Sequence, residues 1–244
     1  MQTCNILGVN IAVTNMIDTV NYIQDNLEIL KGNYICVSNV HTTVMAYENE
    51  EYRKIQNGGA LALPDGGPLS VVSRKRGYKN AERVTGPDLM NEIFKISEYR
   101  GYTHYFYGST EETLKFMKQA LIEKYPKLNI VGLYSPPFKQ VVSMENYNKI
   151  LEINNLKPDF VWVGLGAPKQ EEWMYLHKNK INSIMIGVGA GFDYCANKIS
   201  RAPLWMQKNN LEWIFRLLQD PKRLFNRYIK TNSKFMFLMA RSKK

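Results

Sequence analysis

The stretch Val161-Trp162-Val163-Gly164-Leu165-Gly166-Ala167-Pro168-Lys169-Gln170-Glu171-Glu172 sets the expected fold. An apolar run ends in two glycines, and a proline suited to the first turn of a helix follows. Backbone amides at such a helix start attract anions, because the helix dipole is positive there. Lys169 and Gln170 add hydrogen-bond donors beside these amides. An ordinary strand-to-helix turn is the alternative, but the polar group favours a site for a phosphate or a nucleotide sugar.

Strands and helices alternate on both sides of this stretch. Strands are expected at residues 6–13, 34–40, 60–63, 103–107, 128–133, 160–163 and 183–186. Helices are expected at 14–30 with Thr14 as the cap, at 42–54, 69–76, 87–99, 109–124 with Ser109 in a capping box, 143–155 and from 168. This alternation predicts an α/β, Rossmann-like, mostly parallel sheet with helices on both faces. Ligands bind at the carboxyl ends of the strands in such sheets.

Charge divides the chain into two unequal parts. Residues 200–244 hold eleven lysines and arginines and two acids, which gives this segment +9 of the net +10. We therefore predict a near-neutral Rossmann-like domain at 1–199 and a helical, basic appendage at 200–244. The basic residues Arg223, Arg227, Lys230 and Lys234 share one helical face, and Phe225, Tyr228, Ile229 and Met236 lie on another.

Such a basic amphipathic helix suits an anionic membrane surface. A helix that packs on the domain and shows a solvated charged face is the alternative, and this spacing alone fits both equally well. The apolar end at residues 235–240, which further cations follow, favours the membrane. Nucleic acid is a weaker candidate, because large aliphatic residues rather than glycine or serine separate the cations.

Several classes of protein are disfavoured by what the sequence lacks. Cys4, Cys36 and Cys195 are far apart and odd in number, so no disulfide framework is expected and a reducing cytoplasm is the simplest location. No signal peptide is recognisable, and no apolar run reaches the ~20 residues of a membrane span. Asp-x-Asp, phosphate-loop and nucleophile-elbow motifs are missing, so we expect no bound metal; cations and helix N-termini would then neutralise any departing diphosphate.

Two residues stand out as candidates for chemistry. Asp65 lies between a short apolar strand and two glycines, where a carboxylate is placed to accept a proton from a sugar hydroxyl. An Asp-Gly turn is the alternative, and the motif alone favours the turn. Arg83 precedes a Thr-Gly-Pro-Asp segment and has the forked donors that clamp a diphosphate.

Three further polar residues follow expected strands. Asp193 ends a second glycine-rich segment, where it would bind sugar or ribose hydroxyls or serve as a helix cap. Asn39 opens a helix after a strand. His41, beside it, is interpreted as structural because nothing in the sequence pairs with it.

Taken together, these segments resemble the WecG/TagA/CpsF family of bacterial glycosyltransferases. The matching segments span nearly the whole chain, and their order and spacing are specific although each is moderate alone. They are Asn39 with its helix, Leu63-Pro64-Asp65-Gly66, Arg83-Val84-x-Gly86-x-Asp88-Leu89, residues 164–171, Gly187-Val188-Gly189-x-x-Phe192-Asp193, Arg201-Ala202-Pro203 and Leu211-Glu212-Trp213-x-x-Arg216-Leu217.

The resemblance implies an inverting transfer of an N-acetylhexosamine, with N-acetylmannosamine expected, from a UDP-sugar to a polyprenyl-diphosphate-linked sugar. Teichoic acid or surface-polysaccharide synthesis at the inner face of the cell membrane is the implied setting. From the sequence itself we expect no cofactor, no metal and no nucleic-acid partner. Asp65 matches the proposed base. The residues that we expect to bind substrate are Asn39, Arg83, Lys169, Gln170, Asp193, Arg216, Arg223 and Arg227. Val37 stands where the family often has threonine.

Other functions are compatible with the same residues. The donor is alternatively a different UDP-hexose or a UDP-uronic acid. A non-catalytic protein that binds nucleotides or polyanions through a basic arm is a second class. A dehydrogenase is disfavoured because the full Gly-x-Gly-x-x-Gly motif is missing. The sequence leaves homo-oligomerisation open.

Overall fold

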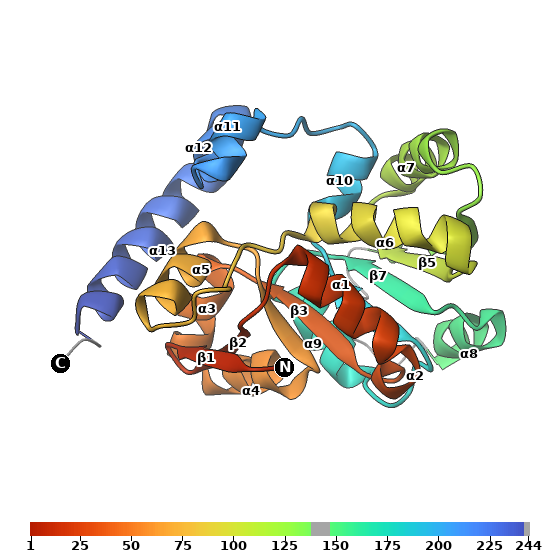
Figure 1. Ribbon diagram of the computed structural model, residues 1–244. Coiled ribbons are helices and arrows are strands. Elements are labelled where there is room, and N and C mark those ends of the chain that lie inside the picture. The colour runs from red at the N-terminus through yellow and green to blue at the C-terminus, as the bar shows by residue number, and fades with distance from the viewer. Residues whose placement is uncertain (138–146, 242–244) are drawn as a thin grey trace.

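A computed structural model describes residues 1–137 and 147–241 of the chain. Its centre is a six-stranded, all-parallel sheet with the strand order β4-β3-β8-β7-β5-β6 (Figure 1). The strands are β3 (Tyr34–Ser38), β4 (Leu61–Pro64), β5 (Thr103–Gly108), β6 (Asn129–Tyr134), β7 (Phe160–Gly164) and β8 (Ile184–Gly187). The predicted α/β, Rossmann-like fold with a parallel sheet is confirmed.

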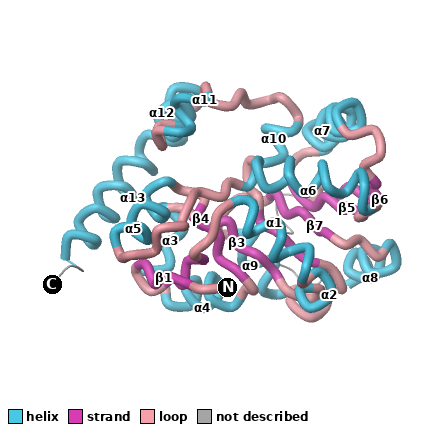
Figure 2. The backbone as a smooth tube through the Cα atoms, viewed as in Figure 1, coloured by secondary structure: helices cyan, strands magenta, loops and turns pink. Residues whose placement is uncertain are grey.

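Helices connect the parallel strands and cover both sides of the sheet (Figure 2). They are α1 (Met16–Asp25), α2 (Leu27–Leu30), α3 (Val40–Glu48), α4 (Glu50–Gly58), α5 (Gly67–Lys75), α6 (Gly86–Arg100), α7 (Glu111–Lys124), α8 (Tyr147–Leu156), α9 (Lys169–Leu176) and α10 (Gly191–Cys195). The first part of the helix predicted at 143–155 lies outside the described residues.

Two hydrophobic cores lie on opposite faces of the sheet. Along β3, Ile35 and Val37 belong to the core that includes residues of α1, α6 and α7, whereas Tyr34 and Cys36 belong to the core that includes residues of α3, α4 and α9. Successive side chains of a strand point to opposite faces, so a strand covered on both faces has an unbroken apolar sequence. This explains why the strands of this chain read as apolar runs rather than as an alternation.

The segment predicted as one strand at residues 6–13 is instead a hairpin. β1 (Thr3–Ile6) pairs antiparallel with β2 (Val9–Ala12). Leu7 and Gly8 both have positive φ, at 51° and 90°, which is the backbone of a tight two-residue turn. The apolar Leu7 hides this turn in the sequence pattern.

The helix predicted at 42–54 is also divided. Asn49 has an extended backbone between α3 and α4, and its side chain accepts the Tyr52 amide N–H and so begins the second helix. Two other helices start one residue later than predicted: Asn15, not Thr14, caps α1, and Thr110, not Ser109, caps α7. Neighbouring polar residues are alternative caps, and the sequence does not rank them.

The C-terminal segment forms three helices that return to the domain. They are α11 (Leu204–Lys208), α12 (Glu212–Gln219) and α13 (Pro221–Arg241). Asp220 accepts the Arg223 amide N–H, so the predicted restart of a helix at Asp220-Pro221 is confirmed. α13 runs alongside α3, with Leu224 and Phe235 buried (Figure 1). The division at 199/200 into domain and appendage stays a prediction.

Of the helices within residues 1–137 and 147–241, none combines the length and the apolar character that a bilayer crossing requires.

Candidate active site

A cavity of about 330 Å³ lies at the carboxyl ends of four strands. Its floor includes Val37 of β3, Asp65 directly after β4, Gly187 of β8 and Gly166 after β7. The first residues of α3, α5, α6 and α10 also line it, and α12 and α13 close it from above. Helix N-termini carry partial positive charge, so this arrangement favours an anionic ligand.

The side chain of Gln170 joins the two glycine-rich loops at the floor. Its Oε1 accepts the amide N–H of Gly166 at 3.1 Å and that of Gly189 at 2.9 Å. Both glycines have positive φ, at 77° and 52°, a backbone that other residues rarely adopt. Gln170 Nε2 donates to Oε1 of the fully buried Glu171 at 2.8 Å. The side-chain amide of Gln170 therefore holds the loops at Gly166 and Gly189 together.

Asp65 lies between β4 and the start of α5 and keeps partial exposure to the cavity. Burial among neighbouring groups raises the pKa of its carboxyl to about 6, although the positive charge of Arg83 acts in the opposite direction. Among the described residues, no ion pair to this carboxylate is found. A carboxylate with a pKa near neutrality suits proton abstraction.

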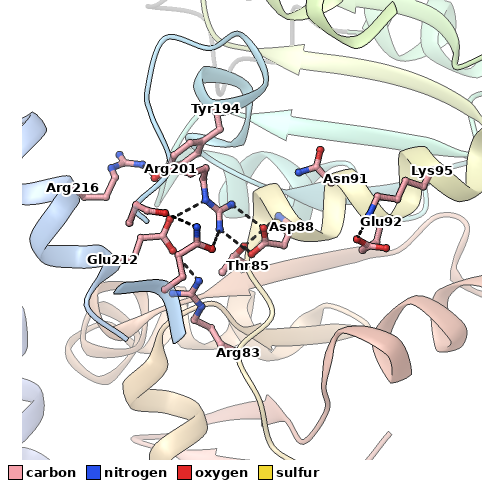
Figure 3. Close-up of polar contacts among 12 residues, drawn as sticks. Arg83, Thr85, Asp88, Asn91, Glu92, Lys95, Tyr194, Arg201, Glu212 and Arg216 are labelled. Carbon is pink, nitrogen blue, oxygen red and sulfur yellow. Dashed lines mark hydrogen bonds and ion pairs between the residues drawn. The ribbon is translucent and has the colours of Figure 1, made fainter. Parts of the chain in front are cut away.

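A chain of alternating charges joins the rim to α12 (Figure 3). Arg83 Nη2 lies 2.8 Å from Glu212 Oε2, and Arg201 Nε lies 3.1 Å from Glu212 Oε1. Arg201 also contacts both carboxylate oxygens of Asp88, at 2.9 and 3.0 Å. Thr85 Oγ1 in turn donates to Asp88. The chain ties the C-terminal helices to the start of α6.

Three arginines of α12 and α13 line the cavity from above. Arg216 donates to the Tyr194 hydroxyl at 2.7 Å and lies over that ring. Arg223 pairs with Asp220 at 2.5 Å but is largely exposed. Arg227 Nε is buried and has no hydrogen-bond partner within the described part of the chain. Buried donors without partners are rare in folded proteins, so Arg227 is available to an anionic ligand.

Most of the predicted site residues come together at this cavity. Those that line it are Asn39, Asp65, Arg83, Gln170, Arg216, Arg223 and Arg227. Asn39 Oδ1 also caps α3 by accepting two amide N–H groups, so this residue has a structural task as well. Lys169 and Asp193 are not among the lining residues that the structure describes, and the cavity gives their predicted roles no support.

Sequence reasoning missed several residues that line the cavity, and four of them bear on its chemistry. His41, interpreted as structural, lines the cavity, and its buried Nδ1 lacks a hydrogen-bond partner among the described residues. Tyr194, Arg201 and Glu212 also line it. Arg201 and Glu212 fell within motifs that carried the family resemblance, which was the available signal, but their pairing depends on the path of the chain through residues 196–211.

The fold and cavity define an α/β protein with an arginine-lined cavity that suits an anionic ligand beside a carboxylate of raised pKa. The family model described as "Glycosyl transferase WecG/TagA/CpsF family" matches residues 4–244. Two Staphylococcus aureus proteins, from strains MW2 and NCTC 8325 / PS 47, are each 30% identical over 98% of this chain and 93% of their own length. Both are named N-acetylglucosaminyldiphosphoundecaprenol N-acetyl-beta-D-mannosaminyltransferase.

The chain therefore belongs to the WecG/TagA/CpsF family, and it is a glycosyltransferase.

Proposed function

We propose that this enzyme transfers N-acetylmannosamine from a UDP-sugar, with inversion, to an N-acetylglucosaminyl-diphosphate carried by a polyprenyl lipid. The names of the Staphylococcus aureus relatives support the sugar and the acceptor. Teichoic acid synthesis at the inner face of the cell membrane is the setting that this acceptor implies.

The observation that carries the proposal is Asp65 at the floor of an arginine-lined cavity. In the proposed reaction, the Asp65 carboxylate takes the proton from the acceptor hydroxyl. The acceptor oxygen attacks the anomeric carbon of the donor, and the bond from that carbon to the UDP oxygen breaks. With a pKa of about 6, Asp65 is ionised at neutral pH but binds a proton more readily than an ordinary aspartate.

Charge at the leaving group is the second requirement of this reaction. We propose that Arg83, Arg216, Arg223 and Arg227 bind the two diphosphates and stabilise the negative charge that builds on UDP. Guanidinium groups bind phosphate oxygens through paired donors, and preorganised cations are most effective where charge develops. The unpartnered Nε of Arg227 and the helix N-termini at the cavity support this assignment.

Asp65→Asn tests the proposal, because it keeps the size of the side chain and removes the base. The wild-type and variant enzymes are incubated with a panel of UDP-sugars and a short-chain lipid-diphosphate acceptor, and UDP release is measured. We expect turnover to fall by about two to four orders of magnitude while UDP binding and the circular dichroism spectrum are retained. Turnover within a few-fold of wild type would exclude Asp65 as the base.

A further inference from the structure

Glu212 is the first residue of α12, and its carboxylate binds residues of the domain (Figure 3). One oxygen accepts from Arg83 and the other lies next to Arg201. The side chains of Arg83 and Glu212 are only 16% and 13% exposed, so this pair is largely shielded from water. Ion pairs in such surroundings are screened less by salt than surface pairs are.

Arg83 has a second carboxylate within its electrostatic reach. Asp65 lines the same cavity, and the charge of Arg83 lowers the Asp65 pKa against the effect of burial. Nevertheless, the described residues give Arg83 an ion pair with Glu212 and none with Asp65. A carboxylate paired with arginine has its pKa lowered by about 1–3 units and becomes a weak base. Which carboxylate Arg83 binds therefore affects how readily Asp65 takes up a proton.

We propose that Glu212 is a positioning residue that holds Arg83 away from Asp65, so that Asp65 is free to take the acceptor proton while α12 is docked on the domain. This inference rests on the proposed function of Asp65. The C-terminal helices then do more than contribute arginines to the cavity. Through Glu212 they also control how readily Asp65 takes up a proton. Arg201, bound to Asp88, anchors the same carboxylate from its other side.

The direction of the effect follows from the charges that face Asp65. Arg83 and Arg201 lower its pKa, whereas Glu212 and Asp88 raise it. Glu212→Gln removes one negative charge and also releases Arg83 toward Asp65. Both changes favour the ionised carboxylate, so we expect the Asp65 pKa to fall from about 6 by about 1 unit. An enzyme that needs ionised Asp65 then keeps its activity to lower pH, with a weaker base.

The test follows the titration of Asp65 directly. Carboxylate signals of ¹³C-labelled aspartates are recorded by NMR against pH, and Asp65→Asn identifies the signal of interest. The acid limb of the kcat/KM profile is measured in parallel, because it reports the free enzyme. Glu92→Gln is the matched control: this carboxylate pairs with Lys95 on the exposed side of α6 (Figure 3). The midpoint of the Asp65 NMR titration and the midpoint of the acid limb should both move to lower pH in Glu212→Gln. Neither should move in Glu92→Gln.

A double-mutant cycle separates the pairing with Arg83 from a simple change of charge. In an Arg83→Gln background, Glu212→Gln should shift the Asp65 titration by less than half as much as in the wild-type background. Equal shifts in the two backgrounds, or an unchanged titration in Glu212→Gln, would overturn the inference. If the circular dichroism spectrum shows that Glu212→Gln does not fold, Glu212→Asp is used in its place. Aspartate keeps the carboxylate but is too short to reach Arg83 as glutamate does.

The NMR titration needs no transfer activity, so the two proposals fail separately. A fully active Asp65→Asn enzyme would reject the proposed base whatever Glu212 does. An inactive Asp65→Asn enzyme together with an unmoved Asp65 titration in Glu212→Gln would reject only the role of Glu212.

Discussion

At the scale of single residues, the environment of Asp65 predicts the pH dependence of the reaction. A general base acts in its ionised form, and burial raises the pKa of Asp65 to about 6. We therefore expect kcat/KM to be constant above pH 7 and to fall about tenfold per pH unit well below pH 6. Steady-state rates between pH 4.5 and 8.5 check this; an acid midpoint near 4, the ordinary range of aspartate, would contradict it.

Gln170 is the residue for which the structure changes the interpretation most. The sequence predicts contact with substrate, whereas the structure shows Oε1 accepting two loop amides. Gln170→Ala should therefore lower the free energy of unfolding by about 1–3 kcal/mol, because it leaves backbone donors without their acceptor. It should also weaken UDP binding, since the loops lose their link.

Urea unfolding and a UDP titration measure these two effects of Gln170→Ala. Gln119→Ala, at an exposed position of α7, is the matched control and should change stability by less than about 0.5 kcal/mol. Normal stability combined with weak UDP binding would favour direct contact with substrate over the structural role.

At the scale of elements, β5 and β7 are joined by a buried polar contact as well as by their ladder. The indole N–H of Trp162 donates to His104 Nδ1 at 3.0 Å, and both side chains are fully buried. Burial lowers the pKa of His104 to about 3, so the imidazole is neutral in the folded protein. The unfolded chain takes up a proton below pH 6.5, which the folded protein does not.

His104 is therefore expected to contribute stability that is present above pH 6.5 and is lost as the pH falls toward 3. The loss from this group is at most about 1.4 kcal/mol per pH unit. Urea unfolding of wild type and His104→Phe between pH 7.5 and 4.5 isolates it, since other titrating groups are common to both. On acidification, the free energy of unfolding of wild type should decline more steeply than that of His104→Phe. If the two plots of unfolding free energy against pH ran parallel, His104 would be protonated in the folded protein.

The elements themselves could largely be predicted, because each depends on nearby residues. Apolar runs located every strand of the parallel sheet, and Asp220-Pro221 located the start of α13. The errors arose where one or two residues change the backbone, as at Leu7 and Gly8 between β1 and β2 and at Asn49 between α3 and α4. The sequence has no local signal for the strand order, which depends on packing between segments far apart in the chain.

The candidate site shows the same limit. Strand ends and glycines identified Asp65 and Gln170, because local pattern places them at one edge of the sheet. The pair of Arg83 and Glu212 joins residues 129 positions apart, and no periodicity connects them. It forms only because the C-terminal helices fold back over the domain.

At the scale of the whole molecule, the distribution of charge and apolar surface predicts how the enzyme meets its lipid-linked acceptor. The predicted basic face of α13 is partly directed inward: Arg223 and Arg227 line the cavity and Lys234 pairs with Glu48. A separate outward stripe consists of Phe225, Ile229 and Met236, which are 53%, 54% and 65% exposed. Spacings of four and seven residues keep these three on one side of the helix.

α13 also carries exposed cations that do not line the cavity. They are Lys222, Lys230 and Arg241. Each basic residue near an anionic bilayer contributes about 1 kcal/mol, and salt screens that contribution. Insertion of the three apolar side chains adds to it. We therefore propose that α13 lies on the membrane surface with the cavity beside the head groups.

The triple variant Phe225→Ser, Ile229→Ser, Met236→Ser tests this docking without removing cavity arginines. We expect it to lose co-sedimentation with anionic vesicles while it keeps its circular dichroism spectrum and its activity on a short-chain, soluble acceptor. Ile17→Ser, Ile29→Ser is the control, because these isoleucines are 72% and 80% exposed on α1 and α2, away from α13. Wild-type binding should weaken as salt rises or as anionic lipid is replaced by neutral lipid. Binding that survives the triple substitution, or that ignores salt and lipid charge, would place the membrane contact elsewhere on the molecule.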